Sequence, residues 1–233
     1  MRKQLSVLVG CERSGIVRDA FAALGHDAWS CDIEPAMTPS NRHIIGDIRQ
    51  VMKSSAWDIL FVAHPPCTRL CNSGVRWLTE PPANRQPGYP EDWLTMTREE
   101  RLEWLWQDLQ RGAELFGDCL NAEHIPCRVV ENPVMHRHAK ARIPNFFQHN
   151  DSFQPWHHAT DEHGPDNVKK RTLLWRINLP RLARTGTLDG STARPDVFKT
   201  PPGPDRGAIR SMFFPGVARA MAQQYSDHAL RIS

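Results

Sequence analysis

The chain has 233 residues, which is enough for one sizeable α/β domain or two very small ones. Its formal net charge is only +3, so bulk charge identifies no partner and any argument for a nucleic acid depends on local basic clusters. It shows no signal peptide and no apolar run near the ~20 residues that span a bilayer. None of its six cysteines forms a Cys-x-x-Cys pair. We therefore expect a cytoplasmic protein with reduced thiols, no membrane partner and no bound metal.

The chain begins with the pattern strand, glycine turn, helix. Residues 5–9 are an apolar run that predicts a strand, a turn runs from Gly10 to Gly15, and residues 16–24 have helical periodicity. Doubly wound α/β folds hold nucleotide-like cofactors on such a turn. The spacing Gly-x-x-x-x-Gly differs from the dinucleotide pattern, so the turn alone does not identify the cofactor.

Two further strands, each followed by an acid, are predicted over residues 27–33 and 43–48. Asp32 lies about twenty residues after the glycine turn, where a carboxylate can accept hydrogen bonds from ribose hydroxyls. The alternative for Asp32 is an ordinary surface carboxylate. Asp47 can accept from an exocyclic adenine amine or simply cap the helix that follows it.

The sequence is organised around residues 57–68. An apolar run predicts a buried parallel strand, which ends at Pro65-Pro66 because proline cannot continue a central strand. Cys67 then lies at the carboxyl edge, where open α/β sheets bind their ligands. The prolines fix the backbone just ahead of its sulfur, so Cys67 is a candidate nucleophile. The alternative is a small buried apolar residue.

A further strand is predicted over residues 125–133; it is apolar and then ends in Glu131-Asn132-Pro133 at the same edge. A glutamate held at a strand end can act as a proton donor, although it can also be a structural carboxylate bonded to backbone amides. Cys67 and Glu131 would pair a nucleophile with an acid on facing strand ends. That pair is more specific than either residue alone.

The remaining segments predict the surroundings of this edge. Residues 68–77 have the composition of a mobile lid over a polyanionic substrate, and residues 79–92 of a loop. Residues 98–116 predict an amphipathic helix with a structural role. The histidine-rich residues 134–167 fit no common metal site.

A basic run precedes the last predicted strand, residues 173–177. Alternation puts Lys169 and Arg171 on one face, where they can bind phosphate or a base carbonyl, or remain a solvated basic face. Residues 180–208 predict a long loop, and residues 217–230 predict a helix introduced by residues 211–215.

These pieces resemble the cytosine-C5 DNA methyltransferase family, in particular its short phage-encoded members. The family's Pro-Pro-Cys appears as Pro65-Pro66-Cys67 and its Glu-Asn-Val as Glu131-Asn132-Pro133. Its Gln-x-Arg-x-Arg is similar to the run Asn-Val-Lys-Lys-Arg at residues 167–171. The match follows the family's order over nearly the whole chain.

The resemblance implies an α/β fold with a doubly wound, mostly parallel sheet of the S-adenosylmethionine-dependent (Rossmann-like) methyltransferase type, in one domain over residues 1–233. It implies methyl transfer from S-adenosyl-L-methionine to carbon 5 of cytosine in DNA through a covalent adduct. The implied catalytic residues are Cys67, Glu131, Arg171, Lys169, Pro66 and Asn132. The implied cofactor-binding residues are Gly10, Cys11, Glu12, Gly15, Asp32, Ile33, Asp47, Ile48, His64, Pro65, Ser211 and Met212.

In the implied chemistry Glu131 holds the ring at nitrogen 3 and the amine, Arg171 contacts the base carbonyl, and Lys169 lies on the phosphate side. The substrate would be a duplex with a flipped cytosine, or single-stranded DNA. The family's large target-recognition domain is replaced here by the short loop region 181–208, which implies little or short sequence context. Arg69, Arg76 and Trp77 are candidates to grip the DNA backbone and fill the gap left by the base.

Other functions stay open at this point. The same chemistry on RNA or a free cytidine nucleotide would explain the missing domain, and a non-catalytic DNA-binding protein on this scaffold is a third possibility. A flavin or nicotinamide oxidoreductase fits the glycine turn poorly. Modification of phage DNA against restriction, in the host-cell cytoplasm, is the purpose that the resemblance suggests. The oligomeric state does not follow from the sequence.

Overall fold

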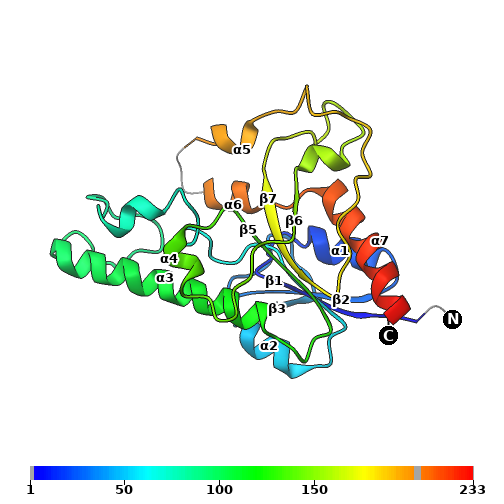
Figure 1. Cartoon of the computed structure of the whole chain (residues 1–233), viewed down its shortest axis with the longest axis horizontal. Helices are drawn as coiled ribbons and strands as arrows, with labels where there is room; N and C mark the ends of the chain where they lie inside the picture. Colours follow the sequence, from blue (N-terminus) through cyan, green and yellow to red (C-terminus); the bar gives the residue numbers. More distant parts are fainter. Residues whose placement is uncertain (1–2, 202–205, 233) are drawn as a thin grey trace.

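A seven-stranded sheet forms the centre of the protein, which we describe from a computed structural model over residues 3–201 and 206–232 (Figure 1). Its spatial order is β3-β2-β1-β4-β5-β7-β6. Strands β1 to β5 run parallel, and β7 is antiparallel to both of its neighbours. The bounds are β1 Ser6–Gly10, β2 Asp27–Asp32, β3 His43–Ile45, β4 Ile59–Val62, β5 Cys127–Asn132, β6 Asp151–Phe153 and β7 Thr172–Ile177.

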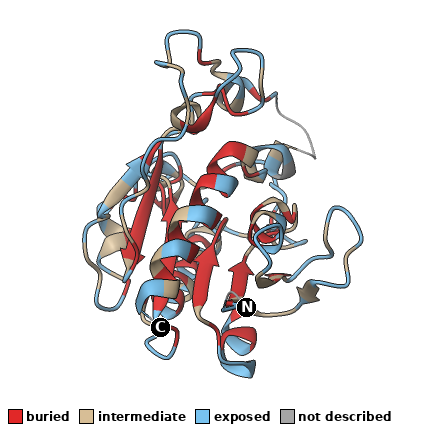
Figure 2. Cartoon of the chain, turned by 90° about the vertical axis from the view of Figure 1, so that its right-hand side faces the viewer, coloured by how far each residue is buried: buried red, intermediate tan, exposed pale blue. Residues whose placement is uncertain are grey.

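Helices cover both faces of this sheet, because alternate residues of the buried strands point to opposite sides. Helices α1 (Ile16–Ala22) and α7 (Pro215–Ile232) cover one face. Helices α2 (Ile48–Ser54) and α3 (Arg98–Leu120) cover the other. Figure 2 shows the buried strands and the inward side of α7 in red, with its outer side exposed. The expected mixed α/β fold with a mostly parallel sheet is confirmed, and it is compatible with a Rossmann-like fold.

The sequence predicted the long elements but missed several short ones. The third strand ends at Ile45 instead of continuing to residue 48, because Asp47 caps α2. In the segment 134–167, which carried no predicted element, the chain forms α4 (Arg137–Lys140), β6 and the 3-10 helix η2 (Pro155–His158). These elements are only three or four residues long, too short to show a period in the sequence.

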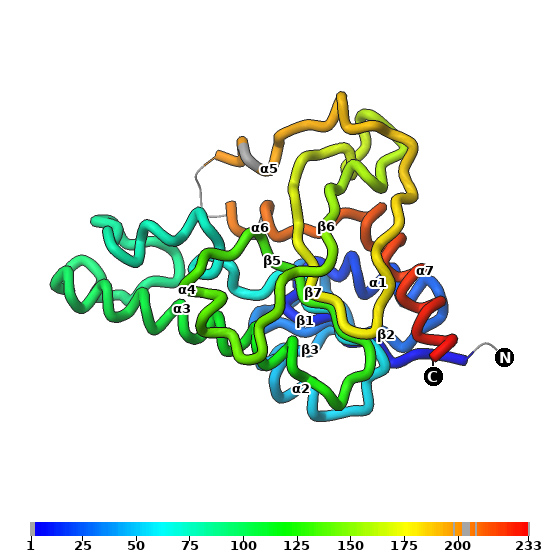
Figure 3. The backbone as a smooth tube through the Cα atoms, viewed as in Figure 1, coloured from blue at the N-terminus to red at the C-terminus, as the bar shows by residue number. Residues whose placement is uncertain are grey.

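Residues 154–169 and 183–201 pack together above the sheet, and we call them the upper lobe (Figures 1 and 3). The amide of Gly186 donates to the carbonyl of His157 at 2.9 Å, and Val168 forms a bridge with Arg194. The predicted loop 180–208 is largely irregular, but it includes α5 (Asp196–Lys199) and the start of α6 (Arg206–Ser211). Residues 202–205 lie outside the described residues.

A long α3 and the segment 68–97 project from the sheet to the left in Figure 1. This segment contains the 3-10 helix η1 (Val75–Leu78). Helix α3 starts with a capping box between Thr97 and Glu100, and it runs four residues beyond its predicted end. Across the described ranges, no helix has both the length and the apolar character needed to cross a bilayer.

The start of α7 fits against the upper lobe so closely that only glycine is accommodated at position 216. The amide of Gly216 donates to Asp166 Oδ1 at 2.8 Å, and a Cβ there would lie 2.7 Å from the carbonyl oxygen of His158. We expect Gly216→Ala to destabilise the protein by ~1–3 kcal/mol through this overlap. Urea unfolding followed by circular dichroism measures the change.

Gly207→Ala is the matched control, because Gly207 also lies in a helix, and among the described residues no atom outside its own helix backbone and chain neighbours lies within 4 Å of the added Cβ. Alanine there is expected to be neutral or stabilising by up to ~1 kcal/mol. Equal unfolding midpoints for the two variants would contradict the tight fit at Gly216.

Candidate active site

The candidate site lies where the carboxyl ends of β1, β4 and β5 meet. Strand β1 is flanked by β2 on one side and β4 on the other, so the chain connections leave this point in opposite directions. Open α/β sheets bind ligands at such a switch point. Val62 pairs with Val130, which places the segments after β4 and β5 next to each other. The turn after β1 adjoins them, because Gly10 pairs with Val62.

The backbone around Cys67 is fixed from both sides. The amides of Leu70 and Cys71 both donate to the carbonyl of Cys67 at 3.0 Å, forming a tight turn directly after it. A Cβ at Gly112 of α3 would lie 3.3 Å from the carbonyl oxygen of Pro66, so α3 packs directly against this backbone. The sulfur is therefore carried on a supported turn rather than on a free loop, as the two prolines predicted.

The Cys67 thiol is half-buried and electrostatically held in its protonated form. Burial, followed by the nearby Cys71 and Glu131, raises the pKa of Cys67 to about 12, while Lys170 acts in the opposite direction. The thiolate is the nucleophilic form of cysteine. Cys67 must therefore lose this proton before it can act as a nucleophile.

Glu131 faces His64 across the ends of β5 and β4. Its carboxylate is 5% exposed, and Oε1 lies 3.3 Å from His64 Nδ1. The other face of the histidine is covered by Phe213, with 5.7 Å between ring centroids. The segment before α7 thus reaches the carboxyl end of β4, and the side chain of Met212, a predicted cofactor-binding residue in this segment, is 43% exposed.

The charge of Lys170, and not that of the predicted Lys169 or Arg171, acts on the pKa of the Cys67 thiol. Lys170 Nζ donates to the carbonyl of Arg210 at 2.9 Å. Burial lowers the pKa of Lys170, while the charges of Glu131 and Cys67 raise it, so all three groups share one electrostatic environment. Lys169 is exposed.

The face on which Lys170 lies follows from the register of β7. Glu131 pairs with Leu174, and the side chain of Leu174 packs on the α7 side of the sheet. Even-numbered residues of β7 share that face, whereas Arg171 falls on the α3 side with Leu173. The sequence shows the alternation but not which set of residues faces the site, because that depends on how β7 pairs with β5.

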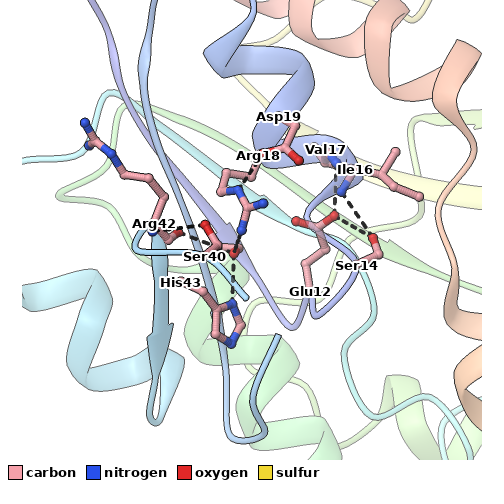
Figure 4. Close-up of polar contacts among 10 residues, drawn as sticks. Glu12, Ser14, Ile16, Val17, Arg18, Asp19, Ser40, Arg42 and His43 are labelled. Carbon is pink, nitrogen blue, oxygen red and sulfur yellow. Dashed lines mark hydrogen bonds and ion pairs between the residues drawn. The ribbon is translucent and has the colours of Figure 1, made fainter. Parts of the chain in front are cut away.

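The glycine turn after β1 contains a buried carboxylate (Figure 4). Glu12 is fully buried, and its Oε1 accepts hydrogen bonds from the Val17 amide and the Ser14 hydroxyl, both at 2.9 Å. Within the described residues Oε2 has no hydrogen-bond partner. Burial raises the pKa of Glu12, and the bonds from Val17 and Ser14 offset part of that effect.

The glycines of this turn are required by close neighbours. Gly15 has a φ of +76°, and the Arg18 guanidinium packs over it. Arg18 in turn donates to the Ser30 hydroxyl at 3.0 Å, which links the turn to β2. At Gly10, an added Cβ would lie 2.7 Å from the side chain of Ile48, which is buried at the start of α2.

The other predicted cofactor residues differ in their burial and in their hydrogen bonds. Asp32 is half-buried at the end of β2 and accepts from the Glu34 amide at 3.1 Å, and burial raises the pKa of Asp32. Asp47 caps α2 and binds the Arg49 guanidinium through both oxygens, so the helix-cap interpretation is confirmed. The Ile33 side chain is 77% exposed. The remaining members are the half-buried Cys11, the buried Pro65 and the half-buried Ser211.

Among the predicted catalytic residues, Asn132 is fully buried. Its Nδ2 donates to the Pro133 carbonyl at 2.8 Å, and among the described residues its Oδ1 is unpartnered.

The structure contradicts the prediction that Arg69 grips a DNA backbone. Arg69 is 5% exposed, forms an ion pair of 3.1 Å with Asp108, and stacks on Tyr89 at 4.9 Å. It instead joins the turn after Cys67 to α3. Arg76 is exposed over the Trp77 ring at 4.1 Å, so these two residues remain available at the surface.

Neither the models of known protein families nor the curated proteins give a match to this chain. The chemistry of the site therefore comes from its own geometry. A thiol, a buried carboxylate with a histidine, and a half-buried ammonium group converge at one sheet edge. Such a set can perform nucleophilic addition with proton transfer.

We expect Lys170→Met to slow alkylation of Cys67 by iodoacetamide. Loss of the ammonium group raises the pKa of the thiol further, and each unit of pKa lowers the thiolate fraction about tenfold at a fixed pH below it. The rate is measured between pH 7 and 10, with the labelled cysteine identified by peptide mass spectrometry. Lys169→Met, which removes an exposed neighbouring charge, should leave the rate nearly unchanged. The same slowing in both variants would contradict a specific role for Lys170.

A second pair of variants tests the structural role of Arg69. Arg69→Gln should lower the free energy of unfolding by ~1–3 kcal/mol, because it leaves Asp108 without its partner and removes buried packing. Arg76→Gln, at an exposed position, should change it by less than ~0.5 kcal/mol. Chemical denaturation measures both values, and an Arg69→Gln protein as stable as the parent would refute the assignment.

Proposed function

We propose that this protein methylates carbon 5 of cytosine in DNA, with Cys67 as the covalent nucleophile. The observation that carries the proposal is the convergence of Cys67, Glu131 and Lys170. They come from three separate parts of the sequence, yet the charges of Glu131 and Lys170 both act on the pKa of the Cys67 thiol, as does the neighbouring Cys71. The motif resemblance and this arrangement support the same chemistry independently.

The chemistry requires a nucleophile because carbon 5 of cytosine is too weakly nucleophilic to attack an alkyl donor. The Cys67 thiolate adds to carbon 6, and the electron pair of the 5,6 double bond moves so that carbon 5 becomes an enamine carbon. Glu131, carrying a proton, donates to nitrogen 3 and so stabilises the added state. After carbon 5 is methylated, loss of its proton and elimination of the thiolate restore the ring and free Cys67.

Lys170 supplies the positive charge that this cycle needs. Its ammonium group favours the thiolate of Cys67 electrostatically, which is the effect already seen on the thiol pKa. The same group can donate a hydrogen bond to the carbonyl oxygen of a base held against Glu131. We assign to Lys170 the role that the resemblance implied for Arg171.

The turn after β1 is suited to a positively charged cofactor. Bound S-adenosylmethionine would supply an electrophilic methyl group. The buried Oε2 of Glu12, which is unpartnered among the described residues, fits a ligand ammonium group, and the half-buried Asp32 fits ribose hydroxyls. Asp47 fits an adenine amine poorly while Arg49 occupies both of its oxygens.

The same turn disfavours a nicotinamide or flavin dinucleotide. Dinucleotide folds place a pyrophosphate at the amino end of the first helix. Here the Glu12 carboxylate already accepts from the Val17 amide at that end of α1, and it would repel a phosphate. Glu12 therefore favours the methyltransferase proposal over the oxidoreductase alternative.

Methylation is tested with the parent protein, Cys67→Ala and Cys119→Ala. Each is incubated with labelled S-adenosylmethionine and, separately, with duplex DNA, single-stranded DNA, RNA and dCMP, and the digested nucleosides are identified by mass. We expect 5-methylcytosine in DNA, reduced at least 10³-fold in Cys67→Ala because the addition step is lost.

Cys119→Ala is the matched control, since Cys119 is a buried thiol on α3 outside the site. Label in RNA or dCMP alone would move the activity to those substrates. Full activity of Cys67→Ala, or no label in any substrate with cofactor bound, would refute the proposal.

A further inference from the structure

A small basic cavity lies on the side of β7 opposite to Lys170. Its volume is about 150 Å³. It lies between α4, the segment leading to β6, and the start of β7, and it belongs to none of the groups around Cys67 described above. The lining residues are Val134, Met135, Lys140, Gln148, His149, Arg171, Leu173 and Trp175.

The cavity has three basic groups and no acidic one. Lys140 ends α4, His149 precedes β6, and Arg171 precedes β7, so three separate segments bring the basic side chains together. In the part of the chain that the structure describes, neither Lys140 nor Arg171 forms an ion pair. Grouping unpaired like charges costs free energy unless an anion joins them.

His149 connects these cations to the wall of the cavity. Its Nδ1 lies 2.7 Å from Nε2 of Gln148, and its ring contacts Trp175 with 5.8 Å between centroids. Burial, then the charges of Arg171 and Lys140, lower the pKa of His149. A bound anion would oppose the two charges and raise that pKa.

The cavity is joined to the candidate active site by the backbone after β5. Met135, in its wall, forms a bridge with Cys71, and the amide of Asn72 donates to the carbonyl of Val134 at 2.9 Å. The same segments carry Glu131 and Cys67 a few residues earlier. A strand that delivers a base to Cys67 would therefore pass close to this cavity.

We propose that the cavity binds a phosphodiester group of the nucleic-acid strand whose cytosine enters the site, an inference that rests on the proposed function. A small cavity of about 150 Å³ with three basic groups in its wall suits one phosphate group. Arg171 provides a planar fork for two phosphate oxygens, and Lys140 adds a point charge. The contact reads no base and fixes only the position of the strand.

The test measures binding of a fluorescent single-stranded oligonucleotide by anisotropy between 50 and 300 mM salt, without methyl donor. The variants are Arg171→Gln, Lys140→Gln and their combination, with Lys53→Gln on α2 as an exposed control. Each lost phosphate contact should reduce the slope of log K against log salt by about 0.7, and the control should not. An unchanged slope in the double variant would overturn the proposal.

A second measurement separates the sources of phosphate. Nuclear magnetic resonance follows the His149 titration with inorganic phosphate and with the oligonucleotide. A raised pKa with both ligands, lost in Arg171→Gln, supports the proposal. A response to inorganic phosphate with no change in oligonucleotide binding would identify a free-phosphate site instead and overturn it.

These readouts are independent of catalysis. If methylation fails while the salt slope changes as expected, the proposed function fails and the phosphate contact stands. If methylation succeeds with unchanged slopes, only the cavity assignment is refuted.

Discussion

The site depends on the parallel pairing of β4 with β5. Because Val62 lies beside Val130, both strands end at one edge and deliver the Cys67 turn and Glu131 to the same place. Strand β7 is antiparallel to β5, so it begins where β5 ends and brings Lys170 to that edge as well. Both faces of these strands are buried under helices, and a shift of register by one residue would separate the three groups.

A thiol, a carboxylate and an ammonium group that lie together with little exposure to solvent influence one another's charge. With Glu131 and Lys170 charged and Cys67 neutral, the cluster is balanced, and a thiolate would add one negative charge. A thiolate with a protonated Glu131 has the same total charge as the resting cluster. In the proposed mechanism, transfer of the thiol proton to Glu131 would keep the total charge of the cluster unchanged and would give the carboxyl group that donates to a cytosine ring.

The sequence predicted the parts of the fold that depend on local pattern. Apolar runs ending in Pro65-Pro66 and Glu131-Asn132 showed where two strands end, and helical periodicity located α1, α3 and α7. It failed for Lys170, because which of three adjacent basic residues faces the site depends on the register of β7 against β5. It also failed for Arg69, because the burial of that side chain depends on Asp108 and Tyr89 folding around it.

Adjacent residues at the start of β7 serve opposite faces of one sheet. Lys170 shares one electrostatic environment with Glu131 and Cys67, whereas Arg171 lines the basic cavity on the α3 side. One short basic run can then act on the base and on the backbone of the same strand. Contacts to phosphate supply affinity without reading sequence, whereas base discrimination requires side chains at the base edges. Under the proposed function, the protein would therefore bind DNA mainly through the phosphate backbone and methylate cytosine within a short sequence context.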